Sequence, residues 1–300
     1  MAVLLAIVMP IWAFNVQAEL GAEGTSCERA AAAIAGSFQH LQQTTPPTAG
    51  RHGTKIAIVI DDLGYNLQKG RSAVALPGAV TLAVLPHSPH GRVLAKLAHQ
   101  AGREVMLHLP MSNVSGQALD QGALTDAMDQ AVFTATLREN LNAIPHIRGV
   151  NNHMGSRLTQ NGQSMRWLMR ELKPRGLYFV DSRTSPHTIA LQTATEYGLA
   201  SLERNFFLDN ERDCLHIARQ FQLFLADARR TGQGLAIGHP YPETLQFLSA
   251  ALPQLAALDV QLVPVSRLLP HTPSPSNTGS RPLDGFRDHV ERLLPALGQE

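Results

Sequence analysis

Apolar runs alternate with amphipathic stretches through the middle of the chain, and this pattern predicts strands followed by helices. Residues 56–60 are all apolar, mostly β-branched, and lead directly into two carboxylates and a glycine. An unbroken apolar run of this length is typical of a strand buried on both faces of a parallel sheet. Further runs predict strands at residues 80–85, 104–109, 149–152, 177–180, 205–208, 235–237 and 261–265. The intervening patterns predict helices, for example at residues 91–100, 165–172, 214–229 and 244–258.

Strands that alternate with helices in this way predict an α/β fold with a parallel sheet. The number of such units in residues 54–270 favours a distorted (β/α) barrel over an open, doubly wound sheet. The first strand is not followed by a glycine-rich phosphate-binding motif, so no nucleotide is expected. A net charge of +1 is unlike the basic footprint of a nucleic-acid-binding protein.

The ends of the chain differ from this central region. Residues 1–18 predict a secretory signal peptide, because an apolar segment is followed by small residues suited to cleavage. The segment lacks the usual preceding basic residues, and a retained membrane anchor is the alternative. Either way, the protein is expected in the periplasm or outside the cell. Residues 19–53 predict a leader with one short helix and a Pro-containing linker.

Residues 271–300 predict a second linker and a short amphipathic helix. Phe286, Val290, Leu293 and Leu297 would lie on its apolar face, which could pack on the barrel or bind a protein partner.

The chain has two cysteines, Cys27 in the leader and Cys214 in a predicted helix. An exported protein could join them in a disulfide. Their large separation in sequence, and the weakly structured leader around Cys27, argue against that pairing. They do not form the closely spaced pair that binds a metal.

Two adjacent acids, Asp61 and Asp62, end the first predicted strand. Successive strand side chains point in opposite directions, so the two carboxylates are expected to have different roles. One could bind a cation while the other accepts protons. The alternative is that they cap the following helix.

Polar residues also end several other predicted strands. They are His108, Asn151 to His153, Asp181 to Arg183, and His239. In a (β/α) barrel these strand ends converge on one face. Asp and His together suit a divalent metal of the zinc type. Each histidine alone could be structural, but their joint placement predicts a functional site.

The motifs around these positions resemble those of the divergent polysaccharide deacetylases. The resemblance rests on residues 60–64, 151–156, 179–184 and 237–240 and spans roughly residues 55–269. It implies a distorted (β/α) barrel that removes acetyl groups with the help of a metal. It also implies that Asp61 is the catalytic base, Asp62 a metal ligand and His239 the catalytic acid.

One element of the family pattern is changed. His108 matches the first histidine of the family's HxxxH ligand pair, but Ser112 stands at the second position. His153, from the next strand, is expected to supply the other ligand. The predicted ligand set is therefore Asp62, His108 and His153, with zinc as the expected metal.

These assignments predict a metal-dependent hydrolase that acts on an acetylated envelope polysaccharide. Asp181, Arg183 and Arg157 are candidates for binding the substrate, although such arginines are often structural ion-pair partners. The competing hypothesis is a non-catalytic envelope protein that keeps the barrel and binds a glycan or a protein.

Overall fold

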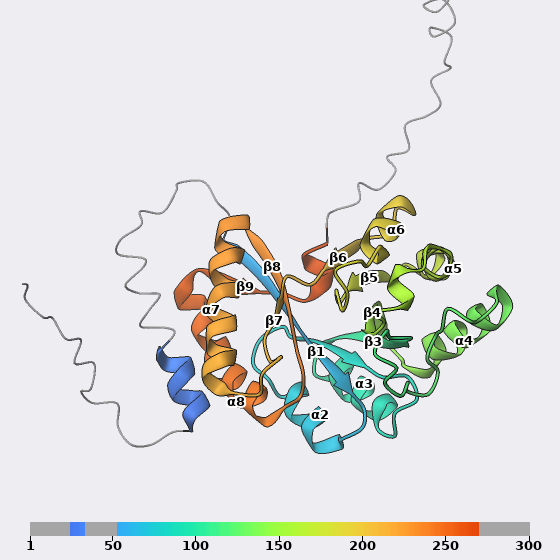
Figure 1. Cartoon of the computed structure of the whole chain (residues 1–300). Helices are drawn as coiled ribbons and strands as arrows, with labels where there is room; N and C mark the ends of the chain where they lie inside the picture. Colours follow the sequence, from blue (N-terminus) through green and yellow to red (C-terminus); the bar gives the residue numbers. More distant parts are fainter. Residues whose placement is uncertain (1–24, 34–52, 270–300) are drawn as a thin grey trace, which may run out of the picture.

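The computed structural model describes residues 25–33 and 53–269, which Figure 1 shows as coloured ribbon. The predicted signal peptide, linkers and C-terminal helix lie outside these residues. Within the described residues, no helix has the length and apolar character needed to cross a bilayer.

A nine-stranded sheet, parallel at every recorded pairing, forms the centre of the molecule (Figure 1). Its order is β6-β5-β4-β3-β2-β1-β8-β7, and β9 pairs with the beginning of β1. Among the described strands, β6 and β7 are not paired with each other, so the curled sheet does not close. This half-closed barrel confirms the predicted distorted (β/α) fold. The strands are β1 (Thr54–Leu63), β2 (Thr81–Val84), β3 (Glu104–Met111), β4 (Ile147–Met154), β5 (Tyr178–Asp181), β6 (Ser201–Glu203), β7 (Phe206–Phe207), β8 (Gln233–Gly238) and β9 (Val260–Leu262).

Helices connect the strands and pack on the outer face of the sheet. They are α2 (Leu67–Val74), α3 (Gly91–Gln100), α4 (Gln130–Ala143), α5 (Gly162–Leu172), α6 (Ala190–Glu196), α7 (Cys214–Thr231) and α8 (Pro242–Ala251). Four of them begin at a polar side chain that accepts a hydrogen bond from the first turn: Asn66, Asp129, Asn161 and Asp213. These caps fix where the helices start relative to the strand ends.

The eight predicted strand regions each contain a strand, with three differences in detail. β6 was not predicted, because this strand is only three residues long, is partly polar and is only half-buried. The single helix predicted at residues 244–258 is α8 followed by the 3-10 helix η3 (Leu252–Leu258). Pro253 lies in the first turn of η3, where a proline cannot donate the hydrogen bond that would continue α8. β9 begins one residue earlier than predicted and ends at Leu262.

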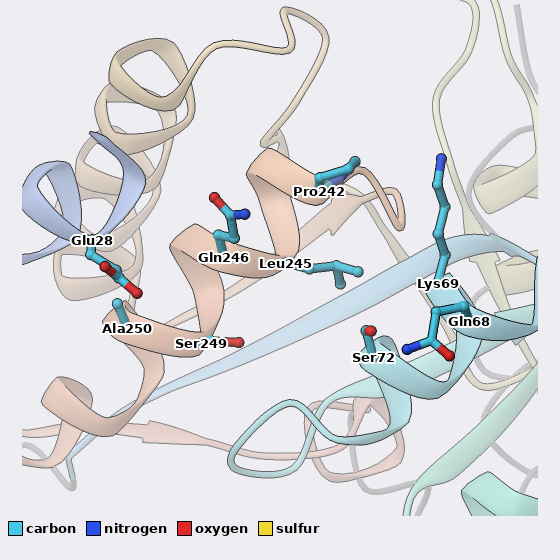
Figure 2. A pocket seen from close by; sticks show the side chains of 9 residues that line it. All are labelled: Glu28, Gln68, Lys69, Ser72, Pro242, Leu245, Gln246, Ser249 and Ala250. Carbon is cyan, nitrogen blue, oxygen red and sulfur yellow. The ribbon is translucent and has the colours of Figure 1, made fainter. Parts of the chain in front are cut away.

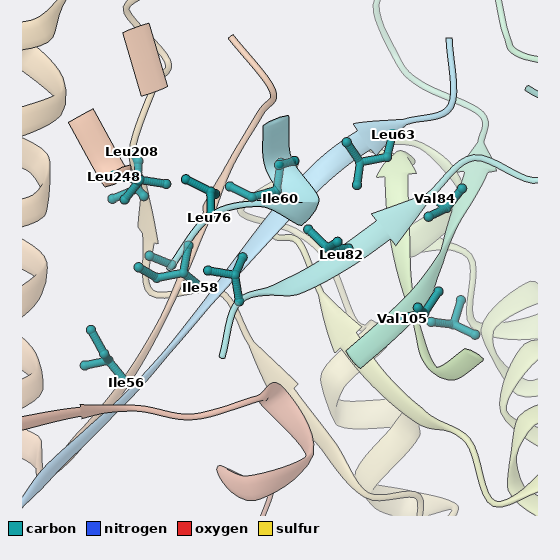
Figure 3. Packing of buried hydrophobic residues seen from close by; sticks show 14 of the residues in the cluster. Ile56, Ile58, Ile60, Leu63, Leu76, Leu82, Val84, Val105, Leu208 and Leu248 are labelled. Carbon is teal, nitrogen blue, oxygen red and sulfur yellow. The ribbon is translucent and has the colours of Figure 1, made fainter. Parts of the chain in front are cut away.

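β1 is buried on both faces, as its apolar run predicted. Side chains of Ile56, Ile58 and Ile60 point toward the helices and join the larger core cluster (Figure 3). The alternate residues Ala57 and Val59 join a second cluster, which lies inside the barrel. Strand alternation therefore places residue 61 on the inner side, toward the barrel interior.

A disulfide joins Cys27 to Cys214, the first residue of α7. The two cysteines are therefore paired, contrary to the expectation from the sequence. The helix of residues 26–33 packs on the folded chain, with Cys27 and Ala31 almost fully buried, and this packing brings the two Cα atoms to 4.9 Å. Separation along the sequence does not limit such a contact when a segment docks on a folded surface. The bond closes a loop that contains most of the barrel.

We expect the disulfide to stabilise the fold measurably. Replacing both cysteines with Ser should lower the free energy of unfolding by about 2–4 kcal/mol, since the cross-link restricts the unfolded chain. Thermal unfolding followed by circular dichroism would measure the change, and wild-type protein in reductant should behave like the double variant. Ser26→Ala is the matched control, because Ser26 donates a hydrogen bond to Cys214 Sγ but forms no cross-link. Equal unfolding temperatures for all forms would contradict a stabilising role.

Candidate metal centre

The carboxyl ends of four strands bring the predicted polar residues together. Asp61 and Asp62 belong to β1, His108 to β3 and His153 to β4, while His239 directly follows β8. In the sheet, β1 lies between β8 and β2, and β3 lies between β2 and β4. Parallel pairing therefore aligns these strand ends along one edge of the barrel.

The backbone at Asp62 separates the two adjacent carboxylates. Its φ of 56° is in the left-handed region, where a residue other than glycine carries strain of about 1–3 kcal/mol. The pairing of β1 with β2 is irregular at this point, between Ile60 and Leu63. As a result Asp61 is buried, whereas one third of the Asp62 side chain is exposed. The capping alternative is wrong, because Asn66 caps α2.

One atom from each predicted ligand converges on a common point. Asp62 Oδ1 lies 3.1 Å from His108 Nε2 and 2.9 Å from His153 Nδ1. The two ring nitrogens are 3.0 Å apart. Ligand atoms around a tetrahedral zinc are roughly 3.3 Å apart, so small side-chain shifts would admit the ion. One carboxylate and two imidazoles are a donor set that zinc accepts, with a fourth position left for water.

A second set of contacts fixes the ring of His108. His108 is almost fully buried, and its Nδ1 donates to Asn151 Oδ1 at 2.9 Å. The amide nitrogen of Asn151 in turn donates to Asp61 Oδ1 at 2.8 Å. This chain leaves Nε2 of His108 facing Asp62. Asn151 thus orients both the predicted ligand and the predicted base.

The charges in the cluster are strongly coupled. Burial alone would raise the pKa of Asp62, but hydrogen bonds from His108 and His153 bring that pKa well below its usual value. Burial alone would lower the pKa of His108, whereas the Asp61 and Asp62 carboxylates raise that pKa to about 9. Burial raises the pKa of Asp61. The acids therefore favour a positive charge at this point, which a proton or a metal ion can supply.

His239 faces the cluster from the other side of β1. Its Nε2 lies 3.8 Å from Asp62 Oδ2, and its Nδ1 donates to Asp209 Oδ1 at 2.9 Å. Asp209 also accepts hydrogen bonds from the His239 backbone at 2.6 Å and from Thr244 Oγ1 at 2.7 Å. The Phe207 ring lies parallel to the imidazole, with the two ring centroids 5.5 Å apart. The ring is thus held with one nitrogen directed at the candidate site.

The predicted substrate-binding residues lie outside this cluster. Asp181 is buried and accepts hydrogen bonds from the Arg183 backbone and from Thr188, so it holds its own loop. The Arg183 side chain forms an ion pair with Glu203. The exposed Arg157 side chain forms one with Asp126. Both arginines therefore form the structural ion pairs that were the alternative to substrate binding. Their role in binding substrate stays a prediction.

Four residues near the site were not predicted from the sequence: Asn151 as an orienting residue, Asp209, Asp120 and Arg204. Asp209 directly follows a predicted strand, so the rule that selected the other strand ends could have found it. Arg204 donates to the carbonyls of Ser182 and Arg183 and lies 4.2 Å over the Phe207 ring. Asp120 lies in the long β3–α4 connection, where no local pattern marks it.

A cavity of about 490 Å³ lies elsewhere, between the helix of residues 26–33, α2 and α8 (Figure 2). Glu28, Lys69 and Gln246 are among its lining residues, and none of the Asp–His cluster residues is. This cavity is therefore separate from the candidate metal centre.

The family model of the divergent polysaccharide deacetylases matches residues 58–269, and the chain belongs to this family. The match confirms the resemblance drawn from the strand-end motifs. The family suggests a polysaccharide substrate, and the barrel carries a candidate Asp/His metal site.

Two relatives and one solved structure extend this result. The uncharacterized protein YibQ of Escherichia coli K12 is 39% identical over 229 residues, 76% of this chain and 70% of that protein. An uncharacterized protein of Haemophilus influenzae is 37% identical over 215 residues, 72% of this chain and 76% of that protein. A crystal structure of an uncharacterized protein from Agrobacterium tumefaciens has a TM-score of 0.70 and 24% identity, covering 76% of this chain and 94% of that chain. That structure supports the fold alone.

Metal analysis tests the three-residue ligand set. The purified protein should carry about one divalent ion per chain, and replacing Asp62, His108 or His153 with Ala should lower the occupancy sharply. His87→Ala is the matched control, because His87 bonds Asn140 away from the cluster and should affect stability alone. Full metal retention in the three ligand variants would overturn this assignment.

Proposed function

We propose that this protein is a zinc-dependent hydrolase that removes acetyl groups from an envelope polysaccharide. The observation that carries the proposal is the placement of two proton-transfer groups around one candidate metal centre. Asp61 and His239 are outside the ligand set, yet each lies beside it. A zinc ion bound there would acidify a water molecule and polarise the acetyl carbonyl.

Asp61 is suited to the role of general base. Its carboxylate is buried, so its raised pKa makes it a stronger proton acceptor than an exposed aspartate. The hydrogen bond from Asn151 holds Oδ1 of this carboxylate in place at the carboxyl end of β1. In the proposed reaction Asp61 takes the proton of the attacking water.

His239 is suited to the role of general acid. Burial alone would lower its pKa, but the hydrogen bond and charge of Asp209 raise that pKa above its usual value. The imidazole therefore keeps its proton to a higher pH than an ordinary histidine, and Nε2 could deliver that proton to the departing amine or hydroxyl. Removing that proton at alkaline pH would stop this step.

The disulfide supports the proposed location. Disulfides persist in the periplasm and outside the cell, where thiols are not kept reduced. We propose that residues 1–18 direct the protein to this compartment, where acetylated envelope glycans are found. Asp181, Arg183 and Arg157 remain the proposed substrate-binding residues.

The alternative of a non-catalytic binding protein rests on Ser112, which replaces the second histidine of the family motif. Ser112 donates to Asp126 Oδ1 at 3.2 Å, so it belongs to the β3–α4 loop contacts. His153 supplies a nitrogen in its place. With His153, the site has three candidate metal ligands despite the serine at position 112, and this favours an enzyme over a binding protein.

The two neighbouring acids should respond differently to the same substitution. Asp61→Asn should keep the metal but lower turnover by about 10²–10⁴-fold, because the amide cannot accept the proton. Asp62→Asn should lose metal and turnover together, since an amide is a poor ligand for a divalent ion. Metal analysis and acetate release from acetylated peptidoglycan would be measured on the same preparations.

Three outcomes of this comparison are informative. Unchanged turnover in Asp61→Asn would reject it as the base. Equal metal loss in both variants would show that the acids act as one ligand cluster. Glycan binding without acetate release, in metal-loaded wild-type protein and across a panel of acetylated glycans, would support the binding-protein alternative.

A further inference from the structure

The three histidines of the site share one arrangement. In each ring, one nitrogen faces Asp62 and the other approaches a side-chain oxygen from outside the ligand set. The outer oxygens belong to Asn151 for His108, Asp209 for His239 and Asp120 for His153. The first two are hydrogen bonds of 2.9 Å.

The contact of His153 with Asp120 is the unusual one. His153 Nε2 is buried and lies 3.0 Å from Asp120 Oδ2, but the alignment falls short of a hydrogen bond. A buried ring nitrogen without a partner is rare in folded proteins and calls for a reason. A small rotation of either side chain would complete the bond.

The chemistry of a metal-bound imidazole gives that reason. To bind a metal through Nδ1, His153 must carry its proton on Nε2. That N–H needs an acceptor in a buried place, and Asp120 Oδ2 is directly beside it. A carboxylate at this position fixes the tautomer and ring orientation and makes the imidazole a stronger ligand.

Asp120 is itself held in place from a different part of the chain. The hydroxyl of Tyr65, three residues after Asp62, donates to Asp120 Oδ1. Asp120 thus has one oxygen toward Tyr65 and the other toward His153. The contact ties the β3–α4 connection to the β1–α2 connection beside the metal centre.

We propose that Asp120, held by Tyr65, is a positioning residue that orients His153 for metal binding. This inference rests on the proposed metal-dependent function and adds two residues to it. Removing such a carboxylate typically weakens metal affinity by about 10–100-fold, because the ring loses both its tautomer and its orientation.

Zinc affinity of the full chain tests the proposal without relying on turnover. Metal-stripped protein would be titrated with zinc against a chromophoric chelator. Asp120→Ala should raise the dissociation constant about 10–100-fold. Asp120→Asn keeps an acceptor but loses the charge, and Tyr65→Phe removes the hydrogen bond that holds Asp120. Each should raise the dissociation constant by a smaller factor. The ligand-field spectrum of the cobalt form should shift in Asp120→Ala, which a merely structural role would not cause.

Asp126→Asn is the matched control. Asp126 lies in the same connection and bonds Ser112 and Arg157, but it does not contact His153. Its substitution should leave zinc affinity unchanged while removing an ion pair from the loop. Thermal unfolding of the metal-free variants would show that each remains folded.

The possible results separate this inference from the function on which it rests. Wild-type protein that binds no zinc would overturn both. Tight zinc binding by wild type and equally tight binding by the Asp120 variants would overturn the positioning role alone. A loss in Asp126→Asn equal to that in Asp120→Ala would also overturn it, since the loop and not the carboxylate would then be responsible.

Discussion

Separation of the two neighbouring carboxylates at the end of β1 is the constraint on which the site depends. Asp61 continues the inward face of the strand and is buried beside Asn151. The left-handed backbone at Asp62 turns the second carboxylate toward His108 and His153. Without that turn, strand alternation would leave the two acids on opposite faces of the sheet. The local strain is balanced by the hydrogen bonds that Asp62 gains.

The pairing of β3 with β4 explains how the site accommodates serine at position 112. Asn151 lies opposite His108 in this pairing, and His153 lies two residues further along the same strand. Residues two apart share a face, so Asn151 and His153 both reach His108. A neighbouring strand thus brings the candidate ligand His153 beside His108, whereas the family resemblance implies a ligand four residues after His108. The candidate ligands His108 and His153 are thus brought together by the pairing of β3 with β4, and not by close spacing within one segment.

Much of this arrangement could be predicted from the sequence, because it follows from local patterns. Apolar runs located the main strands, and polar residues at their ends identified Asp61, Asp62, His108, His153 and His239 as candidates. The features that were missed depend on contacts between distant segments. Asp120 reaches His153 from a long connection, and Cys27 reaches Cys214 through docking of the leader helix. The side-chain partners of Arg157 and Arg183 likewise became visible only in the folded chain.

The proposed centre of the site is a divalent metal held by Asp62, His108 and His153. The most direct measurement is anomalous diffraction at the zinc absorption edge from crystals of the zinc-loaded protein. A single strong peak should lie about 2.0–2.2 Å from Asp62 Oδ1, His108 Nε2 and His153 Nδ1. Absence of a peak among these atoms at saturating zinc, or a peak held by other residues, would contradict the central claim.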